Sequence, residues 1–481
     1  MINFRIIARV ISQMLIIEGL FMLISAFVSL IYKEHSAPLF YSALITIVTG
    51  ILVFTPLRNE ERVYGTREGY ILITAVWIVF SLFSTLPFLL SNSVDSFTDA
   101  FFESMAGCTT TAASTFTNIE LISHGIIFWR SVIQWLGGAA IIIFALSVFP
   151  VIKTINIQLT INDFSGLMSD KIHPRISEAA KRLIIIYVLI TLIEALFLVI
   201  GGMTLFEAVC HSFSTISTGG FSTRNDGLAA FTSPFIRVVI ILFMFIAGTN
   251  MSLIYFGIKR NFEKISGNNE FVLYGLICIV FSLAAAIILF IKSGFSAVQA
   301  ILDGAFNVIS IITTTGFYTH DYNGWSNLLI LILFLLMFVG GMAGSSSGGI
   351  KVLRILIVGK NVRKEIRRLI HPDALLPVRV DKKTVPQGII FNLLVYITIY
   401  LIVICISTFI SSLMDYDIIT SFSTSASLLG NIGPGIGTFG PFTNYSVFPS
   451  GAKWFLSILM LIGRIELLTI IILFTRSFYK R

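Results

Sequence analysis

Long apolar runs recur along the chain and are separated by short polar segments. Clear examples cover residues 71–90, 183–200, 235–258, 271–291, 389–410 and 454–475, and two more lie near 6–31 and 38–56. Each run has roughly the 20 residues that an α-helix needs to cross a hydrocarbon core of about 30 Å. The pattern predicts an all-α polytopic membrane protein.

A second pattern lies between these runs, where four segments align without gaps. They begin at Asp99 (DAFFESMAGCTTTAAST), Glu207 (EAVCHSFSTISTGGFST), Asp303 (DGAFNVISIITTTGFYT) and Thr420 (TSFSTSASLLGNIGPGI). In each, about a dozen residues precede a Gly/Thr-rich piece, which is too short a stretch to cross a bilayer. The repeat therefore predicts four re-entrant helices. The three acidic starts suit the first turn of such a helix, because a carboxylate is stabilised at the positive end of the helix dipole.

The Gly/Thr-rich pieces predict a shared binding site for an ion. Irregular backbone at membrane depth is tolerated only when it is buried in protein or lines a cavity, so four such pieces indicate convergence on one axis. Backbone carbonyls around that axis can replace the hydration shell of an ion. Gly220, Gly316 and Gly433 share one register, and glycine permits the positive φ that turns carbonyls inward. In the first segment Ala112 occupies the position of these glycines. Because alanine has a Cβ, a positive φ there costs roughly 1–2 kcal/mol. We expect the first segment to be strained or to direct its carbonyl differently.

Composition and charge placement support a membrane protein. Hydrophobic residues make up 56% of the 481 residues and charged residues 12%, whereas soluble proteins have about a quarter charged residues. The net charge of +8 comes from alternate loops, at 58–67, 153–182, 259–264, 351–383 and 476–481. This is the positive-inside pattern, so we expect both termini in the cytoplasm and no nucleic-acid partner. The run 351–383 is also suited to docking a protein partner or anionic membrane lipid.

The sequence contains no constellation of residues typical of an enzyme. Cys108, Cys210, Cys278 and Cys405 lack the spacing of metal ligands and are predicted to be small buried residues. Nucleophile motifs, P-loops and dinucleotide fingerprints are also missing from the sequence.

The stretch GGMAGSSSGG at 340–349 interrupts another apolar run. Each glycine lowers helix stability by about 1 kcal/mol relative to alanine, and a polar loop at membrane depth must line a cavity. We predict a gating loop that plugs the pathway when closed, with Lys351 and Arg354 anchoring its cytosolic end. The predicted loop residues are Gly340, Gly341, Gly344, Ser345, Ser346, Ser347, Gly348 and Gly349. A kinked, glycine-rich packing segment is the alternative.

Arg464 lies about ten residues into an apolar run. A charge at the bilayer centre costs at least ~2.5–3.5 kcal/mol and usually faces a cavity. Arg464 is therefore predicted to face the pathway as a barrier to cations, with an ion pair to Glu194 or Glu466 as the alternative. Arg130 is nearer the outer end of its run and is predicted to be interfacial.

Five stretches carry a family resemblance: QWLGGAAIIIFALSVFP (134–150), HSFSTISTGGFST (211–223), TTTGFYTHDY (313–322), GGMAGSSSGGIKVLRIL (340–356) and GRIELLTIIILFT (463–475). Over essentially its whole length the chain resembles the TrkH/TrkG subunits of bacterial Trk potassium-uptake systems, in the TrkH/KtrB/plant-HKT superfamily. The resemblance implies two N-terminal helices (1–66) followed by four pore repeats of helix, pore helix and helix in pseudo-fourfold arrangement. The expected repeats are 67–160, 161–265, 266–370 and 371–481.

The resemblance also implies gated potassium uptake across a bacterial inner membrane. Potassium would be the substrate, without a cofactor in this chain, and nucleotide would bind only to a cytosolic TrkA-like ring that regulates a homodimer. The loop 340–349 and Arg464 would form the gate. The ion-coordinating carbonyls would belong to Thr110, Thr111, Ala112, Thr218, Gly219, Gly220, Thr314, Thr315, Gly316, Asn431, Ile432 and Gly433.

Two alternatives stay open at this point. Sodium or weakly selective cation transport is one, because in the plant branch a serine at the position of Ala112 goes with sodium transport. A secondary transporter of an organic solute is the other. Such transporters carry broken helices in inverted pairs, whereas these four segments repeat in one orientation.

Overall fold

The computed structural model describes residues 2–59, 65–147, 172–374, 376–381 and 383–479. Parts of the predicted basic loops, including Arg62, Lys153 and Lys171, lie outside these ranges. The expected boundary between the first two repeats, at residues 160 and 161, also lies outside them.

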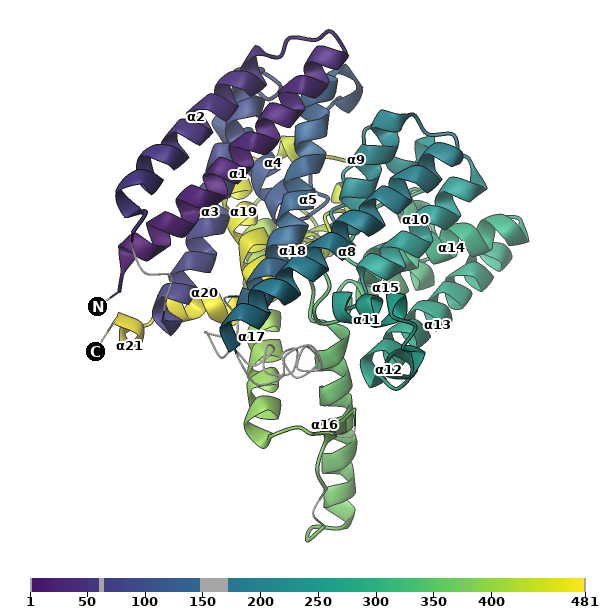
Figure 1. Cartoon of the computed structure of the whole chain (residues 1–481). Coiled ribbons are helices and arrows are strands. Elements are labelled where there is room, and N and C mark those ends of the chain that lie inside the picture. Colours follow the sequence, from purple (N-terminus) through teal and green to yellow (C-terminus); the bar gives the residue numbers. More distant parts are fainter. Residues whose placement is uncertain (1, 60–64, 148–171, 375, 382, 480–481) are drawn as a thin grey trace.

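Two N-terminal helices, α1 (Phe4–Ile31) and α2 (Ala37–Phe54), form a closely packed pair (Figure 1). Gly19 of α1 lies against Ala43 and Ile47 of α2, and Gly50 of α2 lies against Ile16 of α1. Small residues at such contacts allow two helix backbones to approach closely. The short helix η1 (Thr55–Leu57) follows α2.

Four short helices occupy the predicted re-entrant positions: α4 (Phe97–Cys108), α9 (Leu205–Ile216), α14 (Ala297–Ile312) and α18 (Ile418–Leu429). Each begins after a side chain that accepts a hydrogen bond from the first turn: Ser96, Thr204, Ser296 and Asp417. These caps satisfy backbone N–H groups that have no partner inside the helix. At the exposed start of α18, hydrogen bonds from Thr420 lower the pKa of the Asp417 carboxyl below its usual value.

The expected helix start at Asp303 is wrong. Asp99 and Glu207 lie in the first turn of α4 and α9, but α14 begins at Ala297, so Asp303 lies in its second turn. The apolar residues that precede Asp303 extend this helix outward, and Asp303 pairs instead with Arg237.

Other helices flank these four. They are α3 (Thr66–Leu90), α5 (His124–Ser147), α8 (Ile172–Ile200), α10 (Pro234–Ala247), α11 (Met251–Ile258), α13 (Asn269–Lys292), α15 (Asn327–Leu336), α17 (Gln387–Ser412), α19 (Ser450–Ile465) and α20 (Leu467–Leu473). Shorter elements are α12 (Phe262–Ser266), α21 (Arg476–Tyr479), η2 (Ile119–Leu121), η3 (Gly227–Ala230), η4 (Tyr322–Gly324), η5 (Gly437–Phe439) and η6 (Tyr445–Val447). Within the described residues, 7 helices are long and apolar enough to cross a membrane, or up to 9 if each bent pair is one span.

Two runs expected as continuous spans are broken. The chain bends by 109° between α10 and α11 and by 111° between α19 and α20. In the first, Gly248, Thr249 and Asn250 are poor helix formers, and the Asn250 side chain caps α11 by accepting from Ser252 N. In the second, Glu466 adopts a φ of 71°, which ends α19.

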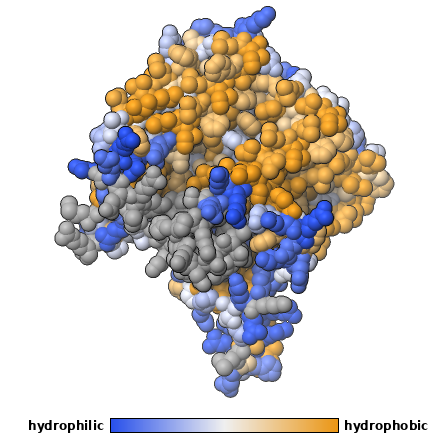
Figure 2. Space-filling model, in the orientation of Figure 1, coloured by the Kyte–Doolittle hydropathy of each residue, from blue (hydrophilic) through white to orange (hydrophobic). Residues whose placement is uncertain are grey.

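The helix α16 (Val352–Ile370) projects away from the bundle, with the chain termini toward the same end (Figure 1). A small hairpin of β1 (Arg379–Val380) and β2 (Lys383–Thr384) follows α16 and supplies the strands found among the described residues. Figure 2 shows hydrophobic side chains over most of the bundle and hydrophilic ones on the projecting part.

The cysteine prediction is confirmed for Cys108, Cys210 and Cys278, which are buried, and is wrong for Cys405, which is exposed. Cys405 lies on an outward face of α17 whose neighbours Ile402, Ile406 and Phe409 are also exposed. On a membrane-spanning helix, such an apolar face contacts lipid.

Candidate ion pathway

The four short helices end in one repeated backbone conformation. Thr110, Thr218, Thr314 and Asn431 follow the helix ends with φ of 53°, 55°, 57° and 56°. The next residue donates its N–H to a helix carbonyl five positions back, at 2.8 Å from Thr111 to Ala106, and the other three segments repeat this bond. This is a Schellman ending. β-Branched residues rarely adopt positive φ, so the surroundings impose this conformation on the threonines.

The glycines at the shared register are required by close contact between segments. Gly220, Gly316 and Gly433 all have positive φ, of 76°, 77° and 115°. A Cβ on Gly220 would collide with the carbonyl of Thr315, and one on Gly316 with the carbonyl of Ile432. A Cβ on Gly433 would collide with the backbone of Ala112. The Gly/Thr-rich pieces therefore meet one another at a common centre.

Ala112 departs from this pattern, and of the two outcomes expected for it the strained backbone is not found. Residue 112 is not among the non-glycine residues with positive φ in the described chain. Its N–H donates to the carbonyl of Ile432 at 3.0 Å. Its methyl group lies 2.7 Å from the place a Cβ would take on either Gly220 or Gly316. The first segment thus avoids strain by turning its backbone differently and placing a methyl group at the centre.

Several of the predicted ligand carbonyls accept hydrogen bonds from the protein. Gln134 Nε2 donates to Gly219 O at 2.6 Å, and the Tyr445 hydroxyl donates to Gly433 O at 2.7 Å. The carbonyl of Ile432 accepts from Ala112, as described above. An ion coordinated by these oxygens would compete with the hydrogen bonds.

Polar residues at the fifth position of the first three repeats brace the segment that follows the Gly/Thr-rich piece. Glu103 accepts from Thr115 N at 2.7 Å, His211 Nε2 lies 3.0 Å from Ser222 Oγ, and Asn307 Nδ2 donates to Thr319 Oγ1 at 3.1 Å. Each contact joins a short helix to the chain that follows its Gly/Thr-rich piece, and so fixes the position of that piece.

Arg130, which is predicted to lie near the outer end of its run, is buried within the protein. Its side chain is 3% exposed, and its Nε lies 2.6 Å from Glu103 Oε1. The guanidinium also donates to Ser222 O at 3.0 Å and lies 3.6 Å from the centre of the Phe221 ring. A buried charge is retained when it is paired and hydrogen-bonded, and Glu103 on α4 supplies the partner.

Two further ion pairs are related by the repeat. Arg237, the fourth residue of α10, pairs with Asp303 of α14 at 3.0 Å. Lys453, the fourth residue of α19, pairs with Asp99 of α4. In each case the helix after one Gly/Thr-rich piece is tied to the short helix of the next repeat around the ring.

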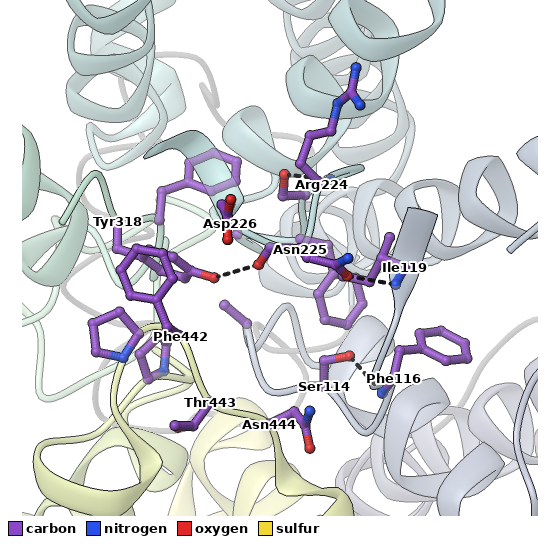
Figure 3. Close-up of a pocket in the computed structure, with 18 of the residues that line it drawn as sticks. Ser114, Phe116, Ile119, Arg224, Asn225, Asp226, Tyr318, Phe442, Thr443 and Asn444 are labelled. Atoms are coloured by element: carbon purple, nitrogen blue, oxygen red, sulfur yellow. Dashed lines mark hydrogen bonds between the residues drawn. The ribbon is translucent and has the colours of Figure 1, made fainter. Parts of the chain in front are cut away.

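A cavity of about 230 Å³ lies above the central segments (Figure 3). Its lining includes Ala112 and Gly220 from those segments, with Tyr318, Phe442 and Asn444 from the outer loops. Asn225 joins these loops, because its carbonyl accepts from the Tyr318 hydroxyl at 3.3 Å and its side chain from Ile119 N at 2.7 Å. The cavity forms an outer mouth that leads to the meeting point of the segments.

The stretch 340–349 is a non-helical loop on the opposite side of the central segments. It lies between α15, which ends at Leu336, and α16, which begins at Val352, so no helix continues through it. Ser346 Oγ donates to Ile216 O at 3.1 Å, and Gly348 N donates to Thr314 Oγ1 at 2.7 Å. Gly348 also lies against Gly430 and Asn431. The loop therefore contacts three of the four segments.

Arg464 contacts this loop and pairs with neither of the predicted acids. Its side chain is 4% exposed, with Nη1 donating to Ser346 O at 2.6 Å and Nη2 to Gly137 O at 3.2 Å. Glu466 instead pairs with Arg354 at 2.8 Å, because the break after Ile465 turns it toward α16. Neither carboxylate oxygen of Glu194 accepts a hydrogen bond from the described residues. The ion-pair alternative is therefore wrong.

The loop is held at both ends by residues outside it or at its border with α16. Lys351 Nζ donates to Ser347 O, four positions earlier. Two other contacts involve Gly248 and Glu270, which the sequence-based prediction does not include. Met342 N donates to Gly248 O at 2.9 Å, and Ala343 N donates to Glu270 Oε1 at 2.6 Å. The Gly-Thr-Asn triplet inside an apolar run was a usable signal for the break at Gly248, whereas nothing around Glu270 in the sequence indicates its partner.

The fold and this arrangement define a class of protein: a multi-pass membrane protein in which four re-entrant helices end in segments that meet at one centre. The chain belongs to the TrkH family, described as "Cation transport protein", whose profile matches residues 36–479. Membership of this transporter family confirms the predicted family, the predicted fold class and the expectation that the chain is not an enzyme.

Relatives match along the whole chain. The Trk system potassium uptake protein TrkH of Escherichia coli (strain K12) is 33% identical, over 99% of this chain and 100% of its own length. The TrkH of Halomonas elongata is 34% identical over 100% of both, and the E. coli TrkG is 30% identical over 99% of both. The crystal structure of the potassium transporter TrkH from Vibrio parahaemolyticus superimposes with a TM-score of 0.91 at 31% identity, covering 100% of both chains.

Proposed function

We propose that this protein takes up potassium through a gated pore in the inner membrane of a bacterium. The observation that carries the proposal is the convergence of four segments that share one backbone conformation. Such a site presents carbonyl oxygens to a desolvated cation. Relatives along the full length are named as potassium uptake proteins. The membrane potential, worth about 2.3 kcal/mol per charge per 100 mV, is sufficient to drive entry.

The proposed filter consists of three residues from each segment: Thr110, Thr111 and Ala112; Thr218, Gly219 and Gly220; Thr314, Thr315 and Gly316; and Asn431, Ile432 and Gly433. We assign the segments to four repeats, at 67–160, 161–265, 266–370 and 371–481, after an N-terminal pair of helices at 1–66. The recurring helix ends, glycines and outer braces support this division.

The proposed gate is the loop 340–349 together with Lys351 and Arg464. The loop fills the space next to three filter segments and is buried for most of its length. The guanidinium of Arg464 adds a positive charge there, which opposes the entry of cations. Opening requires the loop and Arg464 to separate or to move together.

The proposed orientation places both termini, α16 and the hairpin in the cytoplasm. The positive-inside distribution supports it, as does the position of the termini at the same end as α16 (Figure 1). We propose that a cytosolic TrkA-like nucleotide-binding ring contacts this end of a homodimer in lipid, and that this chain itself holds no cofactor.

Uptake of radioactive rubidium into vesicles that contain the purified protein tests the proposal. Excess unlabelled potassium should abolish the uptake, sodium should compete weakly, and an organic solute should have no effect. Equal competition by sodium and potassium would favour the second candidate, a sodium-permeable or weakly selective transporter. Ala112 is the observation behind that candidate, since it breaks the fourfold pattern of the filter. Failure to transport any monovalent cation would refute the proposal.

A further inference from the structure

A single carboxylate ties the cytosolic hairpin to the start of α13. Asp381 lies at the turn between β1 and β2, with φ of 48°. Its Oδ1 accepts from Asn269 N at 2.7 Å and from Asn269 Nδ2 at 2.6 Å, and its Oδ2 accepts from Asn268 Nδ2 at 3.2 Å. The hairpin and the first residue of α13 are therefore held together by three hydrogen bonds to one charged group.

The next residue of α13, Glu270, holds the gating loop. Its side chain is 1% exposed, and its Oε1 accepts from Ala343 N at 2.6 Å and from Leu353 N at 3.2 Å. Ala343 belongs to the loop, and Leu353 lies in the first turn of α16. One carboxylate thus joins the two ends of the chain segment that contains Ser345, Ser346 and Ser347.

Apolar packing connects the hairpin to the same loop. Val378, Val380 and Val385, from the hairpin and its flanks, are buried in one cluster with Ala343 and Leu353. A further bond, from Lys360 Nζ to Arg379 O at 2.9 Å, fixes the hairpin to α16. A displacement of the hairpin therefore disturbs both residues whose N–H groups Glu270 binds.

We infer that Glu270 and Asp381 are positioning residues that hold the gating loop closed, and that the hairpin of β1 and β2 transmits a cytosolic contact to the loop. The inference rests on the proposed function and assigns its regulation to specific groups. The path runs from Asp381 through Asn269 to Glu270, and from Glu270 to the backbone of the loop. A protein that pulls on the hairpin weakens this path without touching the membrane-embedded part of the chain.

The first test removes the hairpin's carboxylate. Glycine accepts the φ of 48° at this turn, so Asp381→Gly removes the three hydrogen bonds without straining the backbone. Rubidium flux into vesicles that contain only this chain should rise about tenfold, the effect expected from losing a hydrogen bond to a charged group. Asp381→Asn retains an acceptor and tolerates positive φ, so its flux should stay closer to that of the unaltered chain. Asp373→Asn, at an exposed position in the same region, is the matched control and should change nothing.

The second test asks whether the two carboxylates act along one path. Glu270→Ala removes the acceptor for both N–H groups and should also raise the flux. Combining it with Asp381→Gly should add little, because either change alone breaks the connection. Glu263→Ala, at an exposed acid on α12, is the control. Unchanged or reduced flux in folded single variants, or fully additive effects in the double variant, would overturn the inference. If the unaltered chain carries no cation under any condition, the proposed function itself fails instead.

The third measurement reports the loop directly. Ser345→Cys is introduced into a chain whose four cysteines are replaced, and its reaction with a thiol reagent is timed. Asp381→Gly should speed the reaction about tenfold, as expected for the loss of such a bond. A hairpin with a merely structural role would leave that rate unchanged, and such a result would count against the inference.

Discussion

Replacement of Arg464 is the most direct test of the gate. Arg464→Ala removes the bond from Nη1 to Ser346 O, at 2.6 Å, and the bond from Nη2 to Gly137 O, at 3.2 Å. It also removes a buried positive charge from the pathway. We expect a higher flux of monovalent cations for both reasons.

The size of the effect follows from the loop contact. A hydrogen bond to a charged group contributes about 1.5–3 kcal/mol, so losing the bond to Ser346 shifts the loop equilibrium roughly tenfold to a hundredfold toward the open form. The lost charge adds to this increase. The assay is rubidium uptake into vesicles at a fixed membrane potential, with protein content and thermal unfolding measured for each variant.

Two conservative variants separate the contribution of the positive charge from that of the hydrogen bonds. Arg464→Lys retains the charge and shortens the donor, whereas Arg464→Gln retains a donor and removes the charge. If the charge is the main barrier, the lysine variant stays slow and the glutamine variant is fast. Arg58→Ala, at an exposed position, is the matched control and should behave as the unaltered chain. Unchanged or lower flux in folded Arg464→Ala would refute the role of Arg464 as a barrier.

Three further predictions concern the filter, the loop and the outer brace. Ala112→Gly should increase the preference for potassium over sodium in a competition assay, because the central methyl group is removed; an unchanged ratio would mean that the other segments set selectivity. Shortening the loop within 344–348 should raise flux in the absence of any partner, and unchanged flux would exclude the loop as the gate. Glu103→Gln leaves Arg130 buried without its ion pair, at a cost of about 3–5 kcal/mol; thermal unfolding in detergent should detect this loss, whereas the exposed control Asp95→Asn should unfold like the unaltered chain.

The sequence was sufficient to predict the repeated elements because each is local. Three features can be recognised directly in the sequence: apolar runs of membrane-spanning length, glycines at one register and a glycine-serine stretch inside a span. These features predict the positions of α1, α2 and the four short helices, apart from the early start of α14 at Ala297.

What the sequence did not predict depends on contacts between distant residues. Arg130 and Glu103 are 27 positions apart, Arg354 and Glu466 are 112 apart, and Ala343 and Glu270 are 73 apart. The fourfold pattern alone predicts a positive φ for Ala112, but the structure does not have one there. The N–H of Ala112 instead donates to the carbonyl of Ile432, which lies in another segment. A single sequence contains the charges but does not show which pairs the fold brings together.

The ion pairs that run from one repeat to the next have a consequence for biogenesis. Lys453 and Asp99 are separated by 354 positions, and Ala112 also depends on the carbonyl of Ile432. During synthesis the first repeat therefore enters the membrane with its acid unpaired and its Gly/Thr-rich piece incomplete. The ring closes only after the last repeat has been inserted, so a ribosome that stops early releases a chain in which Asp99, whose side chain is 18% exposed in the complete ring, lacks its cation partner. Complete synthesis of the final repeat is therefore the condition for closing the ring.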